Sequence, residues 1–241
     1  MCIENDYSEF ETRLGYSFKN KELLITAFTH TTYVFEHKRE HFESNQRLEF
    51  IGDSVIDLVI GRVLYDSKPQ ESEGYLSKKR SIIVCEQSFA NAARNLDIGN
   101  YLLLGKGEAQ TGGSCKDSTL ADAFESVIAA VYFDSGFEEA EKVVLYQLND
   151  TIEATLAGTI FLDYKSKLLE VAQKRNNQHR ISFKITDERG PAHQKEFDCE
   201  VCADGLFLAS ATGHSKKDAE QKCAAAAILE YEKVFGSVDV L

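Results

Sequence analysis

Four carboxylates occur as two pairs, each at the spacing of one helical turn. Glu49 and Asp53 are four residues apart in LEFIGDSVIDLVIG, and Asp122 and Glu125 are three residues apart in LADAFESVIAAVY. On a helix, either spacing places both carboxylates of a pair on the same face. The apolar neighbours of the first pair, which predict a helix buried on most of its sides, are Leu48, Phe50, Ile51, Val55 and Ile56.

Two acid pairs on apolar helices need a compensating positive charge, because removing like charges from water costs several kcal/mol per ion. Within one turn of either pair, the sequence offers only Arg47 as a basic side chain. Four hard oxygen ligands without His or Cys among them suit Mg²⁺ or Mn²⁺. A divalent cation held in this way activates water and stabilises the charge that develops on a phosphate and its leaving oxygen. The acids therefore predict a metal site.

Other interpretations of the polar motifs stay open on the residues alone. Acid pairs on helices are often solvated or ion-paired, with no ligand between them. A di-iron carboxylate bundle requires E-x-x-H on two helices, and no His follows Glu49 or Glu125 at that spacing. Cys199 and Cys202 form C-x-x-C, but in a strand an offset of three points the two side chains to opposite faces, which argues against zinc.

Two regions of the sequence, which differ in predicted secondary structure, must position these residues. Residues 1–155 show helical periodicity and no convincing strand alternation, and LLLGKGEAQTGGS, with four glycines, is predicted as a loop. Residues 163–235 predict a helix, three strands (ISFKITDE, EFDCEVCAD and LFLASATG) and a final helix. Residues 156–162 are predicted as a linker. The sequence thus indicates a mostly α N-terminal domain and an α+β domain of order α-β-β-β-α.

The charge is distributed unevenly between these regions. The formal net charge of −12 argues against nucleic-acid binding, but residues 163–241 carry 12 basic and 13 acidic side chains and the remainder of the chain carries −11. Lys216 and Lys217 fall in the first turn of the final helix, where positive charge opposes the helix dipole. A bound anion would account for them. Ser215 and Asp218 resemble a capping box at the start of that helix.

The remaining composition indicates the cellular compartment. No apolar run is long enough to span a membrane, and the acidic N-terminus lacks the basic and apolar regions of a secretory signal. The six cysteines are scattered at a spacing that suits reduced thiols. The sequence therefore predicts a cytoplasmic protein without a membrane partner.

One longer segment carries a resemblance to a known family. NQRLEFIGDSVIDLVI, residues 45–60, resembles the ribonuclease III signature N-E-R-L-E-F-L-G-D-A-V-L, with Gln46 at a position that is often Glu. Four other segments resemble family motifs and occur in the same order as in the family: HTTY, SEGYLSKKRS, LLLGKGEAQTGG and LADAFESVIAAVYFDSG. The resemblance implies a homodimeric, metal-dependent endoribonuclease that hydrolyses double-stranded RNA to 5′-phosphate and 3′-hydroxyl ends and processes ribosomal and other precursor RNAs. It implies Asp53 and Glu125 as catalytic residues, and Glu49, Asp53, Asp122 and Glu125 as ligands of Mg²⁺ or Mn²⁺.

Residues 163–235 resemble a double-stranded RNA-binding domain. The match is carried by YKSKLLEVAQK, by GPAH at residues 190–193 and by ATGHSKKDAEQKCAAAAIL at residues 211–229; Leu169 and Ala211 depart from the usual Gln and Gly. The alternative function is a non-catalytic double-stranded RNA-binding protein whose acids are structural. The residues that the resemblance implies in RNA binding are Glu170, Gly190, Pro191, His193, Ser215, Lys216 and Lys217.

Overall fold

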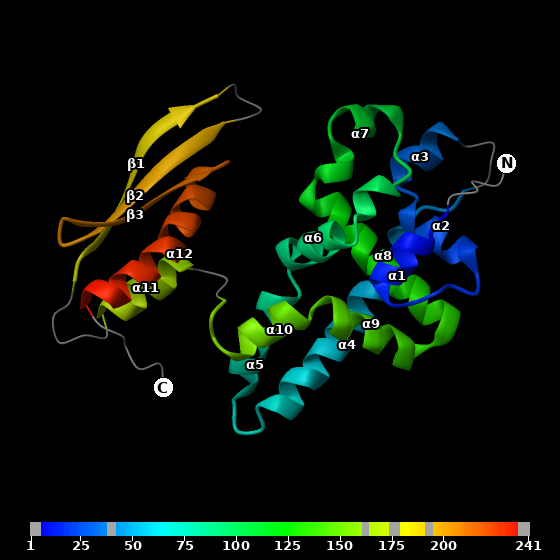
Figure 1. Cartoon of the computed structure of the whole chain (residues 1–241), viewed down its shortest axis with the longest axis horizontal. Coiled ribbons are helices and arrows are strands. Elements are labelled where there is room, and N and C mark those ends of the chain that lie inside the picture. Colours follow the sequence, from blue (N-terminus) through cyan, green and yellow to red (C-terminus); the bar gives the residue numbers. More distant parts are fainter. Residues whose placement is uncertain (1–5, 38–41, 161–163, 174–178, 191–194, 236–241) are drawn as a thin grey trace. The chain divides into compact units, whose positions relative to one another are not determined.

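The computed structural model (Figure 1) describes residues 6–37, 42–160, 164–173, 179–190 and 195–235. The chain divides into two compact units, Met1–Ile160 and Phe161–Leu241. The first unit is helical, and the second has the order helix, three strands, helix. The predicted fold class is therefore confirmed. The point of division falls within the predicted linker at 156–162, whose bounds stay a prediction.

The N-terminal unit is built around two long helices, α4 (Gln46–Ser67) and α8 (Asp117–Ser135), which pack against each other. These two helices carry all four of the predicted acids. Helix α8 is apolar on most sides and also packs against its neighbours α2, α6 and α9, so most of its residues are buried. The other elements of this unit are α1 (Ser8–Leu14), α2 (Lys21–Phe28), α3 (Thr31–Glu36), α5 (Glu73–Ile83), α6 (Glu86–Asn95), α7 (Lys106–Gln110), α9 (Phe137–Gln147), α10 (Asn149–Leu156) and the short 3₁₀ turns Ile98–Asn100 and Gly113–Cys115.

A glycine sets the distance between the two long helices. A Cβ atom at Gly52 would lie 2.5 Å from the carbonyl carbon of Glu125 and would overlap its oxygen. No real side chain tolerates such a contact, so α4 can approach the backbone of α8 this closely only because residue 52 has no side chain. Gly52 lies between Glu49 and Asp53 in sequence, and the contact therefore fixes α4 against α8 beside the predicted acids.

The predicted glycine-rich loop at residues 102–114 contains a short helix, α7, that was not predicted from the sequence. The N–H groups at the start of α7 donate hydrogen bonds to side chains of α3. The N–H of Gly105 donates to Oγ1 of Thr32 at 3.0 Å, and the N–H of Lys106 donates to Oε1 of Glu36 at 2.9 Å. A five-residue helix is not stable alone. It forms here because another segment caps it, and that contact leaves no local pattern in the sequence.

The expectation that α4 is buried on most of its sides is wrong. Leu48, Val55 and Ile56 are buried as expected, but 73% of Phe50 is exposed. Leu58 and Tyr65, eight and fifteen residues further along α4, are also exposed, at 60% and 71%. Such spacing places the three side chains along one face of the helix. Apolar character predicted burial, and it did not reveal that the face lies outside this chain's own core.

The C-terminal unit is an antiparallel sheet with two helices on one face (Figure 1). The central strand β2 (Glu196–Ala203) alternates between buried and half-buried residues. Cys199 is buried against the helices and Cys202 is half-buried, in agreement with their predicted opposite orientation. Asp204 and Gly205, both with positive φ, form the tight turn between the second and third strands. The elements are α11 (Tyr164–Gln173), β1 (Ile181–Arg189), β2 (Glu196–Ala203), β3 (Leu206–Gly213) and α12 (Lys216–Phe235).

Candidate metal centre and RNA-binding surface

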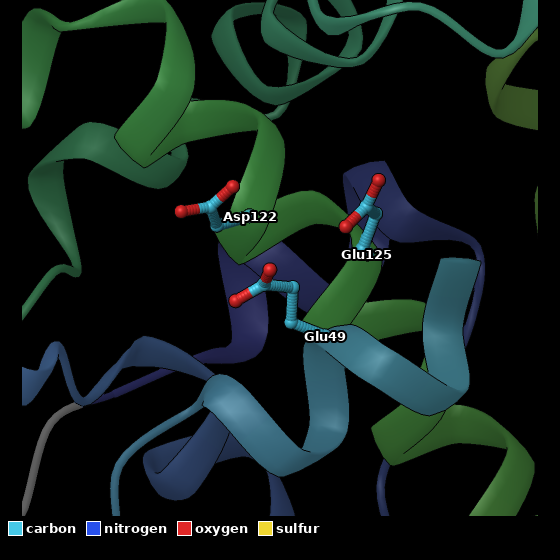
Figure 2. A group of neighbouring side chains, drawn as sticks. All are labelled: Glu49, Asp122 and Glu125. Atoms are coloured by element: carbon cyan, nitrogen blue, oxygen red, sulfur yellow. The ribbon is translucent and has the colours of Figure 1, made fainter.

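Three of the predicted acids come together at the crossing of α4 and α8. Glu49 from α4 and Asp122 and Glu125 from α8 each place a carboxylate oxygen within 4.8 Å of the others. Figure 2 shows the three carboxyl groups gathered between the two helices. All three residues are half-buried. Oxygens at this separation can coordinate one hard divalent cation together.

The acids of the cluster have no ion-pair partner in the described part of the chain. Among the described residues, no Lys, Arg or His forms an ion pair with Glu49, Asp122 or Glu125. Burial, followed by the charges of Asp53 and Glu49, raises the pKa of Glu125 to about 8. Burial also raises the pKa of Glu49 and of Asp122. Carboxylates that are desolvated and close to one another resist ionisation, and a divalent cation would relieve both effects.

Asp53, the fourth predicted acid, lies at the edge of this cluster. It is exposed on α4 and is not one of the three residues whose oxygens lie within 4.8 Å of one another. Its charge nevertheless raises the pKa of Glu125, as the largest cause after burial, and contributes to the raised pKa of Glu49. The structure therefore brings three acids into one site and keeps the fourth within electrostatic range of it.

Other charged residues near the site were missed by the sequence analysis. Glu86, at the start of α6, raises the pKa of Asp122, whereas His30 opposes that rise. Asp57 contributes to the raised pKa of Glu125. His30 and Glu86 lie on other segments, far from α8 in sequence, and no spacing pattern links them to it. Only the tertiary structure, which packs α6 against α8 and brings His30 within electrostatic range of Asp122, could reveal them.

In the C-terminal unit, the start of α12 is capped much as predicted. Ser215 Oγ accepts a hydrogen bond from the N–H of Asp218 at 3.1 Å. The carboxylate of Asp218 accepts in return from the N–H of His214 at 2.9 Å, one residue earlier than in the usual capping box. Lys216 and Lys217 are exposed in the first turn of the helix. Exposed ammonium groups beside a helix N-terminus form a surface that favours anions.

The structure also describes the surroundings of Lys216 and two of the remaining predicted RNA-binding positions, Glu170 and Gly190. Lys216 Nζ lies 3.9 Å from Oε2 of Glu188, a pair too exposed to immobilise it. Glu170 is exposed on α11. Gly190 follows the last residue of β1 and has φ +89, a left-handed conformation that favours glycine. Pro191 and His193 lie outside the described residues, so their predicted role has no structural description.

Comparison with known proteins matches both units. The family model described as "Ribonuclease-III-like" matches residues 20–152. The model described as "Double-stranded RNA binding motif" matches residues 164–231. "Ribonuclease 3" of Anoxybacillus flavithermus is 43% identical over 231 residues, which span 95% of each chain. The chain belongs to the ribonuclease III family. "Ribonuclease 3" of Pelotomaculum thermopropionicum is 41% identical over 91% of each chain.

A solved structure supports the same assignment for the helical unit. The nuclease domain of ribonuclease III from Campylobacter jejuni is 38% identical and superimposes with a TM-score of 0.56, covering 61% of this chain and 98% of that one. As a ribonuclease III, the chain is an endoribonuclease with a double-stranded RNA-binding domain. In the described part of the chain, no helix has both the length and the apolar character needed to cross a membrane.

Proposed function

We propose that this ribonuclease III hydrolyses the phosphodiester bonds of double-stranded RNA with Mg²⁺, or Mn²⁺ in its place, held by its acidic cluster. The observation that carries the proposal is the set of three half-buried carboxylates within 4.8 Å of one another and without a basic partner among the described residues. An all-oxygen donor set suits these hard cations better than zinc, iron or copper. The family is metal-dependent in general, which supports the same interpretation.

The residues take separate roles in this proposal. Glu49, Asp122 and Glu125 supply the carboxylate oxygens that hold the cation, and Asp53 contributes from the exposed edge of the cluster. When bound, the cation activates water and stabilises the negative charge on the phosphate and the leaving oxygen. Asp53 and Glu125 act as the catalytic acids. The raised pKa of Glu125 enables this carboxyl to hold a proton near neutral pH until a cation displaces it.

The C-terminal unit supplies the affinity for the duplex. The ammonium groups of Lys216 and Lys217 and the N-terminus of α12 would contact phosphates across the major groove, and Glu170 and the segment 190–193 would contact the adjacent minor grooves. The products carry 5′-phosphate and 3′-hydroxyl ends. Ribosomal and other precursor RNAs in the cytoplasm are the proposed substrates.

We further propose that the enzyme acts as a homodimer, because one acidic cluster cuts one strand and a symmetric pair of clusters would cut both strands of a duplex. The exposed apolar face of α4, formed by Phe50, Leu58 and Tyr65, supports this assembly. The Campylobacter jejuni nuclease domain is likewise described as having a region involved in dimer formation. Leu58→Glu should yield a monomer in sedimentation analysis, whereas Tyr146→Glu, an equally exposed position on α9, should leave the dimer intact.

The decisive experiment compares cleavage and binding of one long RNA duplex. The parent protein should bind the duplex with or without Mg²⁺ and cleave it only with Mg²⁺, and Glu125→Ala should bind without cleaving. Binding by the parent without any cleavage in Mg²⁺ or Mn²⁺ would instead favour the alternative, a non-catalytic double-stranded RNA-binding protein. The uncompensated charge of the acidic cluster disfavours that alternative, because structural acids are normally paired.

A further inference from the structure

A buried serine links the two helices that carry the acidic cluster. Ser126 follows Glu125 on α8 and is fully buried. Its Oγ donates to the carbonyl oxygen of Asp122 at 2.7 Å, the hydrogen bond that a helical serine commonly makes one turn back. The same hydroxyl also lies 3.2 Å from the carbonyl oxygen of Asn45, the residue immediately before α4. One hydroxyl proton is therefore shared between two helices.

The carbonyl of Asn45 holds the backbone of Glu49 through a hydrogen bond. It accepts the N–H of Glu49 at 2.9 Å, and the N–H of Asn45 donates to the carbonyl oxygen of Thr29, also at 2.9 Å. Asn45 and Thr29 are buried. A displacement of the Asn45 carbonyl would therefore move the first turn of α4 and the carboxylate that it carries. The hydroxyl of Ser126 holds that carbonyl from the side of the helix that bears the two other acids.

Neither carbonyl needs the serine for its own hydrogen bonding, because each has a partner within its own helix or turn. The hydrogen bond between Ser126 and Asn45 therefore serves to orient the start of α4 relative to α8. It acts on one side of Glu49, and the close approach of Gly52 to Glu125 acts on the other. Near the cluster, α4 is therefore tied to α8 by a hydrogen bond at its start and packs closely against the α8 backbone at Gly52.

We propose that Ser126 is a positioning residue that fixes the distance from Glu49 to Asp122 and Glu125, and that it thereby sets the affinity of the cluster for its divalent cation. The proposal rests on the metal-binding role proposed above. Coordination requires ligand oxygens to be held within roughly 0.5 Å of the productive geometry. Groups that orient metal ligands without touching the metal typically change metal affinity or activity by roughly 10- to 100-fold.

The test measures Mn²⁺ binding to the metal-free full-length protein by isothermal titration calorimetry. Ser126→Ala removes the hydroxyl with little change of volume and should weaken Mn²⁺ binding by roughly 10-fold. Ser126→Thr keeps a hydroxyl that can make both bonds and should bind close to the parent. In cleavage assays, Ser126→Ala should need more Mg²⁺ for half-maximal activity and should approach the parental rate when Mg²⁺ saturates.

Ser88 offers a matched control. It is also a buried helical serine of the N-terminal unit, but within the described structure its Oγ has no hydrogen-bond partner. Ser88→Ala should therefore leave Mn²⁺ affinity unchanged. Parental affinity in a folded Ser126→Ala protein would overturn the proposal, and so would an equal loss in Ser126→Thr. If circular dichroism shows that Ser126→Ala is unfolded, Ser126→Cys, which keeps a weak donor, takes its place. Mn²⁺ affinity that is insensitive to Glu125→Gln would instead contradict the metal site itself.

Discussion

The two units of the chain meet the same polyanion with opposite local charge. In the N-terminal unit, three carboxylates crowd together without a basic partner among the described residues, and burial raises the pKa of each. In the C-terminal unit, two exposed lysines stand at the start of α12, where the helix dipole already favours anions. One surface repels phosphate until a cation binds, and the other attracts phosphate directly.

This difference separates binding from chemistry. Affinity for the duplex depends on ammonium groups that need no cofactor, and cleavage depends on carboxylates that need a divalent cation. A negative net charge of −12 is therefore compatible with an RNA-binding enzyme, because most of the excess lies outside the RNA-binding unit. The division also means that substitutions in one unit should leave the other property intact, which can be tested.

The largest effect is expected from removing a single carboxylate of the cluster. Glu125→Gln keeps the shape of the side chain and loses its charge, so cleavage should fall on the order of 10³-fold. Binding of the duplex in the absence of a divalent cation should stay at the parental level, because the lysines are untouched. Single-turnover cleavage and filter binding on the same duplex measure both properties. A parallel loss of duplex binding would contradict the assignment of cleavage to the N-terminal unit and of binding to the C-terminal unit.

The next largest effect is expected where the two long helices touch. Gly52→Ala places a Cβ atom against the Glu125 backbone and should destabilise the N-terminal unit by about 3 kcal/mol, the upper range for overpacking. Gly61 provides the control on the same helix, since the nearest contact of a Cβ there, among the described residues, would be Arg80 at 3.9 Å. Gly61→Ala should stabilise the unit by up to about 1 kcal/mol through helix propensity. Denaturant unfolding of the two variants should shift in opposite directions.

A smaller and more specific effect is expected in the C-terminal unit. Replacing both Lys216 and Lys217 by Ala should weaken duplex binding on the order of 10-fold and reduce the slope of log affinity against log salt by about 1 for each lysine that binds a phosphate. Mn²⁺ affinity should not change. Replacing Lys142 and Lys233, which pair with acids on their own helices, makes the same change in net charge. Equally weakened binding in that control would assign the effect to overall charge.

The smallest effect is a pH dependence of the metal-free protein. Because the pKa of Glu125 is raised from 4.5 to about 8, the folded state retains a proton that the unfolded chain releases. This contribution to stability is complete below about pH 4.5 and is lost as the pH rises through about 8. Glu125 is only half-buried, so solvent screening reduces this contribution. The Tm should therefore fall by a few degrees across this range, and Glu125→Gln should flatten the change. Scanning calorimetry of the two metal-free proteins should detect this difference. An identical pH dependence of Tm in both would contradict the assignment of a bound proton to Glu125.

Much of this organisation follows from patterns within single segments. The apolar periodicity of α4 and α8 predicted the helices, and spacings of three and four predicted which acids share a face. Strand alternation and turn residues predicted the three strands of the C-terminal unit, with bounds within a residue or two. These properties depend on neighbours in sequence, and the residue types alone determine them.

Properties that depend on two distant segments could not be predicted in this way. The exposure of Phe50 depends on which face of α4 the rest of the chain leaves uncovered, and apolar composition does not encode it. The electrostatic effect of His30 and Glu86 on Asp122 depends on the tertiary fold, in which α6 packs against α8. The position of Asp53 at the edge of the cluster depends on the rotation of α4 against α8, and the spacing within α4 leaves that rotation undetermined.

The hydrogen bonds of helix α7 have a consequence for motion in the N-terminal unit. Its N-terminal groups are held by side chains of α3, and the backbones of His30 and Leu103 are hydrogen-bonded to each other. Neither segment can open without breaking bonds that belong to the other. Amide protons of α3 and α7 should therefore exchange with solvent as one cooperative unit, although about 70 residues separate them in the chain. Helices α3 and α7 thus form a single dynamic element assembled from two distant parts of the sequence.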